Sequence, residues 1–294
     1  MRPGRVLQQS LRILVAVAAV AGAAGATNAE VSQARNLYNS TDFERSLKVL
    51  LPIHSKDAAV YELIGRDYYM LGDYKKATEA LEKAIEVEPA NAECALWLGR
   101  AYGRRAETSN LFTAPGQASK ARQYFERSVQ LNPMNLDAQS DLFEYYLEAP
   151  GFLGGGLEKA EATAAHIARI SPAEGQWALA KLAEKRRESS GSIEEHLRRA
   201  IELAPQQVGR FIDLARFLVK QGRFQEAEQS FDRAEKVAPN SPKLIFCRAE
   251  IYVKAHRNLD VAKELLMRYM SAQVNAEDPP KSEAAKLLRQ VQGS

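Results

Sequence analysis

The sequence predicts an all-α solenoid, in which antiparallel helical hairpins stack side by side into one elongated unit. Three observations support this prediction: residues 58–91 align with residues 208–241 without a gap, prolines recur at similar intervals, and large apolar residues alternate with small ones at helical spacing. A single hairpin of this kind cannot bury its apolar face alone. The hairpins must therefore stack on their neighbours.

The aligned positions show why each unit forms a pair of helices. They pair Tyr61 with Phe211, Gly65 with Ala215, Tyr68 with Leu218, Gly72 with Gly222, Ala77 with Ala227, Leu81 with Phe231 and Pro89 with Pro239. The small residues allow the helices to approach closely, the paired glycines suit a tight turn, and the prolines end the second helix. This pattern resembles the tetratricopeptide repeat. The resemblance implies a right-handed superhelical α-solenoid of about six or seven hairpins, closed by a C-terminal capping helix.

The N-terminal segment is expected to direct export. Within residues 1–29, three arginines flank or precede an apolar run at 13–26, and small-residue cleavage sites end at Ala26 and Ala29. This arrangement predicts a secretory signal peptide and a periplasmic or secreted protein. The run is shorter than the roughly 20 apolar residues of a spanning helix. The alternative is an uncleaved segment that anchors the protein to the inner membrane through residues 13–26.

The repeats follow one another along the rest of the chain. The predicted organisation is a signal peptide at 1–29, a degenerate N-terminal hairpin at 30–57, repeats at 58–91, 92–135, 136–174, 174–207, 208–241 and 242–275, and a linker with the capping helix at 276–294. The repeat at 174–207 is degraded, because Lys181 and Glu184 stand where the pattern has small and aromatic residues. The last helix follows Pro279 and Pro280 and opens with the capping-type residue Ser282.

Two neighbouring repeats carry extra residues between their helices, at about 106–120 and 148–157. Equivalent turns of a solenoid lie along one edge, so we expect these two loop insertions side by side. They bring four apolar residues to the surface, namely Leu111, Phe112, Phe152 and Leu153. Two interpretations stay open: the four residues pack against each other or against helix ends, or they form part of a partner-binding patch.

The glycines of the second insertion do not form a phosphate-binding loop. Gly151 and Gly156 have the spacing of such a loop, but Leu157 and Glu158 follow where a lysine and a hydroxyl residue are required. We expect the glycines to adopt positive φ and to allow close packing instead. No nucleotide is therefore expected as a partner.

Other signs of chemistry are weak. The four histidines lie in different repeats, without metal-ligand spacing, and no catalytic constellation is recognisable. Cys94 and Cys247 lie on helices four repeats apart, so we expect two buried thiols and no disulfide bond. Removing residues 1–29 leaves equal numbers of basic and acidic residues, which gives no reason to expect nucleic acid. The sequence predicts no cofactor and no metal ion.

The resemblance also implies a binding surface. In repeats that bind peptides, the first helix of each hairpin lines a concave groove with its non-core positions. Transferring this register assigns to the groove Glu62, Arg66, Tyr69, Leu96, Arg100, Arg104, Asp137, Glu144, Glu148, Arg186, Arg216, Lys220 and Lys254. Basic ends and an acidic middle would favour an extended peptide of complementary charge. The alternative is that these charges belong to an ordinary solvated helix face.

Together these observations predict an exported, non-enzymatic scaffold that binds a protein or peptide in its groove, with the loop edge as a second contact. Membrane contact is expected only if the N-terminal segment is retained. The competing hypothesis is an enzyme or small-ligand-binding protein with its site under the two inserted loops. That hypothesis requires a concave pocket beneath residues 106–120 and 148–157 with converging titratable groups.

Overall fold

The computed structural model describes residues 29–275 and 278–293. The predicted signal peptide, except for Ala29, lies outside the described residues. Within these ranges the chain is helical throughout and contains no strand, which confirms the all-α class. None of the helices in these ranges has the length and apolar character needed to cross a bilayer.

The helices pair into antiparallel hairpins along the chain. Residues 29–39 are helical and pair with α2 (Phe43–Leu50). The next hairpins are α3 (Ala58–Met70) with α4 (Tyr74–Val87), α5 (Ala92–Thr108) with α6 (Ala114–Leu131), α7 (Leu136–Glu148) with α8 (Leu157–Ile170), α9 (Pro172–Lys185) with α10 (Ser190–Leu203), α11 (Val208–Lys220) with α12 (Phe224–Val237), and α13 (Pro242–Lys254) with α14 (Leu259–Ser271). The short 3₁₀ helix η1 (Gly151–Leu153) precedes α8, and α15 (Lys281–Gln292) follows the last hairpin.

Small residues bring the two helices of a hairpin together, as the sequence predicts. A Cβ atom at Gly65 would lie 2.4 Å from Cγ of Leu81, and one at Gly99 would lie 2.6 Å from the ring of Phe125. The turn glycines Gly72 and Gly222 have φ of 80° and 73°. Glycine adopts such backbone angles at little cost because it has no Cβ atom. Helix packing and turn geometry thus follow directly from these residues.

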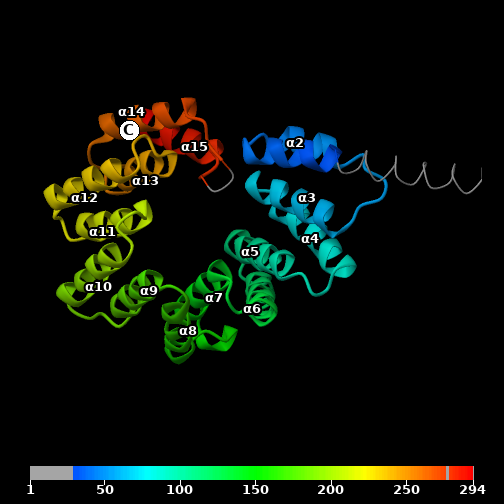
Figure 1. Cartoon of the computed structure of the whole chain (residues 1–294), viewed down its shortest axis with the longest axis horizontal. Coiled ribbons are helices and arrows are strands. Elements are labelled where there is room, and N and C mark those ends of the chain that lie inside the picture. The colour runs from blue at the N-terminus through cyan, green and yellow to red at the C-terminus, as the bar shows by residue number, and fades with distance from the viewer. Residues whose placement is uncertain (1–28, 276–277, 294) are drawn as a thin grey trace, which may run out of the picture.

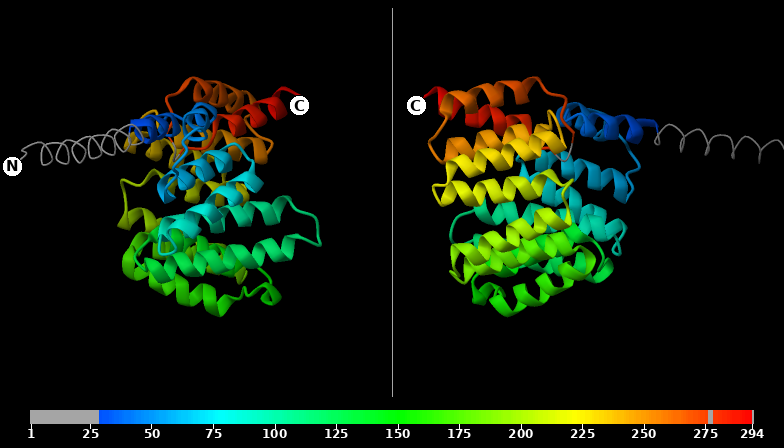
Figure 2. Two further views of the ribbon diagram at one scale, coloured as in Figure 1. Left: turned by 90° about the vertical axis from the view of Figure 1, so that its right-hand side faces the viewer. Right: turned by 60° about the vertical axis from the view of Figure 1, so that its left-hand side comes forward.

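The stacked hairpins curve into an almost closed ring (Figure 1). The first helix of each hairpin, from α3 to α13, lies on the inside of the curve, and the second helix lies on the outside. Figure 2 shows the same stack from two other sides. The two ends of the solenoid meet, since one cleft is lined by Asn36, Asn39 and Ser40 together with Gln273 and Val274. Helix α15 packs Leu287 and Leu288 against the core of the last hairpins.

The first insertion is mostly helical, which corrects the predicted loop at 106–120. Helix α5 continues to Thr108 and α6 begins at Ala114, so only the turn between them is non-helical. The extra residues lengthen both helices. The run from Arg104 to Glu107 consists of good helix formers, and Pro115 occupies a first-turn position where it is tolerated. The side chain of Asn110 accepts hydrogen bonds from the backbone N–H groups of Phe112 and Thr113. The insertion therefore extends the hairpin rather than forming a long loop.

The glycines of the second insertion have the conformational role that the sequence suggests. Gly154 and Gly156 have φ of 87° and 150°. A Cβ atom at Gly155 would lie 1.8 Å from the carbonyl oxygen of Ala149. The N–H of Gly156 donates to the carbonyl of Tyr146 at 2.8 Å. These residues fold the chain back tightly onto the end of α7.

The repeat at 174–207 is better preserved than its sequence suggests. Its turn places Arg187 at φ 58°, in the position of Gly222, and contains one additional residue before α10. This residue shifts the register of α9 by one position. The small core positions are then Ala180 and Ala183, which are buried, and Lys181 and Glu184 point to the surface. The repeat therefore appeared degraded only because its first helix was aligned one position out of register.

The prediction that Ser282 caps the last helix is also wrong, because Pro280 holds the N-cap position.

Candidate functional site

The candidate site is the inner surface of the ring, formed by the first helices of successive hairpins. All but one of the predicted groove residues are half-buried or exposed on these helices or at their ends. The exception is Leu96, which is only 1% exposed and belongs to the core. The neighbouring residue, Trp97, is also buried, at 8% exposure, but its ring lies directly beneath the inner-surface side chains of Arg66 and Arg100.

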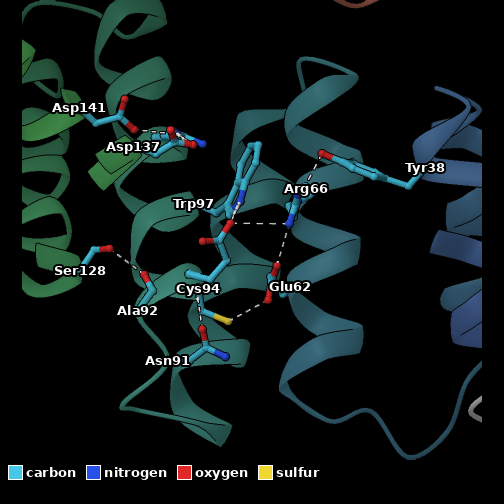
Figure 3. A network of polar contacts seen from close by, with 12 residues as sticks. Tyr38, Glu62, Arg66, Asn91, Ala92, Cys94, Trp97, Ser128, Asp137 and Asp141 are labelled. Carbon is cyan, nitrogen blue, oxygen red and sulfur yellow. Dashed lines mark hydrogen bonds and ion pairs between the residues drawn. The ribbon is translucent and has the colours of Figure 1, made fainter. Parts of the chain in front are cut away.

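Trp97 is the centre of a cluster of arginines and aromatic rings (Figure 3). The guanidinium carbons of Arg66 and Arg100 lie 4.5 Å and 4.9 Å from the centroid of the Trp97 ring. The indole N–H of Trp97 donates to Glu93 at 2.9 Å. Arg66 also donates to the hydroxyl of Tyr38 at 3.3 Å, which links the N-terminal hairpin to this cluster. Cation–π contacts of this kind fix the positions of both arginines.

The arginines of the cluster are already paired with carboxylates. Arg66 lies 3.1 Å from Glu62 and 3.8 Å from Glu93. Arg100 forms ion pairs with Asp137, at 3.5 Å, and with Asp141. The predicted basic end of the groove is therefore neutralised internally. Arg66 and Arg100 hold neighbouring helices in register, and they have little capacity left for a partner.

Beside this cluster, a tyrosine-rich surface extends to the turn between α3 and α4. The ring of Tyr69 lies 5.5 Å from that of Tyr74 and 5.4 Å from that of Trp97. Burial raises the pKa of Tyr69 to about 12. Arg104 donates to the Tyr74 hydroxyl at 3.2 Å. This surface offers aromatic edges and one half-exposed cation.

Helix α7 presents an acidic stripe to the inside of the ring. It consists of Asp137, Asp141, Glu144 and Glu148, of which the sequence analysis missed Asp141. Lys185 lies 2.9 Å from Glu148. Burial raises the pKa of Asp141, and Arg100 opposes this effect. Glu144 forms no ion pair with any residue in the described part of the chain; burial raises its pKa, and the nearby charge of Lys181 opposes this effect.

A small cleft lies between α9, α10 and α11. Its rim carries Trp177, Lys181, Glu184, Asp213, Arg216 and Lys220, and its floor is apolar, with Ile193, Leu197 and Phe217. Lys220 is paired with Glu184 at 2.8 Å, and Arg216 with Glu250 at 3.5 Å. Lys181 forms no close ion pair with a described residue, although its charge acts on Glu144, Glu184 and Asp213. The cavity volume is about 40 Å³, so the cleft fits the end of a side chain rather than a small-molecule substrate.

Two further predicted groove residues can now be placed. Lys254 lies on α13 and pairs with Glu250 at 2.7 Å. Arg186, in contrast, lies at the turn after α9 and pairs with Glu161 of the outer helix α8. The prediction for Arg186 is wrong because of the extra residue in this turn. Lys185 occupies the groove position that had been assigned to Arg186.

The predicted loop-edge residues do not pack against each other. Leu111, Phe112 and Phe152 are 90%, 96% and 81% exposed, and only Leu153 is half-buried. The carbonyl of Leu153 accepts a hydrogen bond from Tyr145 at 2.9 Å, and the side chain of Arg122 lies against Gly154. These contacts lie beneath the second insertion, where the hypothesis of an enzyme or ligand-binding protein required a pocket. A partner-binding role for the exposed residues stays a prediction.

The remaining candidates for chemistry are dispersed. Cys94 is buried in α5, Cys247 is half-buried in α13, and both are free thiols. Burial raises the pKa of both, in the case of Cys247 to about 11, so the thiolate is scarce at neutral pH. The described residues contain no group of three or more His, Cys, Asp or Glu side chains that could hold a metal ion.

Comparison with known proteins identifies the repeat unit. Residues 65–105 match a family described as TPR repeat, and residues 192–246 match one described as tetratricopeptide repeat. The Sol locus transcriptional repressor of Clostridium acetobutylicum is 29% identical over 96 residues, which are 33% of this chain and 27% of that protein. The chain thus spans about a quarter of the length of this relative.

Two solved structures share the fold. A thermophilic TPR protein of Thermus thermophilus gives a TM-score of 0.50 at 23% identity, over 68% of this chain and 98% of its own. A tetratricopeptide repeat protein of Parabacteroides merdae gives 0.54 at 14% identity, over 90% of this chain and 98% of its own. At this level of identity the likeness concerns the fold, and it agrees with the architecture described above.

Proposed function

We propose that this tetratricopeptide repeat protein is an exported, non-enzymatic scaffold that holds an extended segment of a protein partner on its inner surface. The tetratricopeptide fold is consistent with a protein-interaction scaffold. The experiments below test which residues bind the partner segment and whether the protein is exported.

One observation carries the proposal. Two charged groups of the inner surface, the carboxylate of Glu144 on α7 and the ammonium group of Lys181 on α9, form no ion pair with a described residue. Both lie beside a cleft with an apolar floor. Most other charges on this surface are paired within the protein. A cleft of about 40 Å³ admits the end of one side chain. An extended peptide could place an apolar residue there and charged residues of opposite sign beside Glu144 and Lys181.

The test is a charge reversal at these two positions. The double variant Glu144→Lys, Lys181→Glu keeps the net charge, and the immobilised protein would be used to capture partners from an envelope extract. We expect the main captured protein to be reduced at least about tenfold, since each charge-assisted hydrogen bond contributes about 1.5–3 kcal/mol.

A matched control exchanges the same charges on outer helices, in Glu86→Lys, Lys236→Glu. Both residues are exposed, and neither forms an ion pair within the described part of the chain. Capture should be unchanged in this variant. Equal capture by the wild type and the inner-surface variant would show that the partner does not lie across α7 and α9.

Export is proposed from the sequence of residues 1–29. Mass spectrometry of the mature protein would show an N-terminus at residue 27 or 30 if the segment is cleaved at either predicted site. Detection of the intact N-terminus in the membrane fraction would instead support an anchor formed by residues 13–26.

A further inference from the structure

A second cleft lies where the two ends of the solenoid meet. One wall comes from the end of α3, the following turn, the start of α4 and α5, and the other wall comes from the segment before α15 and from α15 itself. Its volume is about 730 Å³, which is in the range of ligand pockets. The residues from the first wall are Tyr69, Met70, Leu71, Gly72, Tyr74 and Arg104. Ring closure is therefore necessary for this cleft to exist.

The second wall carries two cations, Lys286 and Arg289, and two carboxylates, Asp278 and Glu283. Lys286 and Arg289 are three residues apart on α15, so they share one helix face, and both are exposed and line the cleft. Neither forms an ion pair with another described residue. Arg104 adds a third cation from the opposite wall. The cleft thus has cations on both walls.

The carboxylates of the cleft form no ion pair with Lys286 or Arg289 within the described part of the chain. Asp278 is buried, and its carboxylate accepts a hydrogen bond from the backbone N–H of Asn275 at 2.9 Å. Glu283 is the exposed carboxylate in the lining. Arg104 forms an ion pair with Glu107 at 2.5 Å, whereas Glu283, one helical turn before Lys286, forms no ion pair with it. Lys286 and Arg289 are therefore available to an anionic ligand.

The first wall supplies apolar and aromatic surface. Leu71 is exposed, Met70 and Tyr74 are half-buried, and the rings of Tyr69 and Tyr74 meet edge to face. An extended chain that places carboxylates against α15 and an aromatic side chain against Tyr74 would match both walls. We propose that this cleft binds an extended acidic peptide segment of a partner protein that carries aromatic residues among its carboxylates.

This proposal goes beyond the inner-surface function, because its cations Lys286 and Arg289 lie on α15, away from Glu144 on α7 and Lys181 on α9. The probe is a fluorescein-labelled peptide in which glutamate and tyrosine alternate, and binding is followed by fluorescence anisotropy. We expect Lys286→Glu, Arg289→Glu to weaken binding at least about tenfold. Added salt should weaken binding to the wild type as well, because the cations are exposed.

The matched control is Lys236→Glu, Lys263→Glu, which makes the same change of charge on the outer helices α12 and α14. It should bind the peptide as the wild type does. Circular dichroism of both variants would verify that the fold is intact. A peptide in which lysine replaces glutamate should not bind. A photoreactive residue in the acidic peptide should crosslink to the segments 69–74 and 278–289.

Other outcomes would overturn the proposal. These are no binding of the acidic peptide by the wild type, equal loss in the control variant, equal binding of the lysine peptide, or tighter binding of a single-stranded oligonucleotide. The inner-surface variant Glu144→Lys, Lys181→Glu should retain peptide binding at the cleft. If that variant loses envelope capture while the α15 variant binds the peptide normally, the scaffold function stands and the cleft proposal fails.

Discussion

At the scale of single residues, the most unusual group is the carboxyl of Asp67, which is 0% exposed between α2 and α3. Neither of its oxygens forms a hydrogen bond with a described residue. Burial raises its pKa to about 7, against the opposing effects of the neighbouring Ser46 hydroxyl and the Arg66 guanidinium, while Glu44 adds to the rise. Such a carboxyl group is most compatible with the fold when it is protonated.

The stability of the protein should therefore depend on pH through Asp67. Between about pH 4 and pH 7 the folded state holds a proton that the unfolded chain releases, so the free energy of unfolding falls as pH rises. Asp67→Asn should remove this slope and stabilise the protein at pH 8 by roughly 3 kcal/mol or less. Urea denaturation at a series of pH values measures the effect.

The exposed residue Asp232 supplies the control, because its replacement by asparagine leaves the buried group intact. Asp232→Asn should show the pH dependence of the wild type. Parallel curves for Asp67→Asn and the wild type would mean that Asp67 is ionised in the folded protein at acidic pH, contrary to the argument from burial.

At the scale of elements, the turn between α7 and α8 depends on one close backbone contact. Because a Cβ at Gly155 would lie 1.8 Å from the Ala149 carbonyl oxygen, Gly155→Ala must displace the main chain. We expect a loss of about 2 kcal/mol or more in the free energy of unfolding. Gly151→Ala, in the same turn, meets nothing within 4 Å and should change stability by less than about 0.5 kcal/mol. Equal stability of the two variants in urea melts would contradict this account.

The elements also show what the sequence could predict. The hairpins follow from the spacing of small and large residues. Helices α3 and α4 can approach this closely only because Gly65, which faces Leu81, has no side chain. The register of α9 could not be predicted, because one extra residue in its turn is visible only once Arg187 is seen at positive φ. Local insertions of this kind leave composition and periodicity almost unchanged.

The inner surface was predicted in part for a related reason. On α5 and α7 the inner residues are spaced by four, three and four positions: Glu93, Trp97, Arg100 and Arg104, then Asp137, Asp141, Glu144 and Glu148. This spacing is a helical stripe, and it would have selected Trp97 over Leu96 and would have included Asp141. Most of these charges are paired with charges on neighbouring hairpins. This pairing depends on the distances between helices, which cannot be predicted from the residue pattern of one helix.

At the scale of the whole molecule, the meeting of the two ends distinguishes this solenoid from an open superhelix. Each hairpin contacts mainly its neighbours, so small rotations between repeats add up to the curvature of the ring. The cleft between residues 36–40 and 273–275 shows that about one turn is completed within the described chain. The distance between the two ends therefore depends on the packing angles at all the interfaces between hairpins, and a change at any one of them would alter it.

Energy transfer between two dyes would test this closure. Cysteines at Ser40 and Gln273, both exposed, would be labelled with a donor and an acceptor. The native thiols should react slowly, because Cys94 is buried and burial raises the pKa of Cys247 to about 11. We expect high transfer for this pair and much lower transfer for Ser40 with Glu158, which lies on α8 across the ring (Figure 1). Similar efficiencies for both pairs would mean that the ring opens in solution, and the cleft lined by α15 would then lose one of its walls.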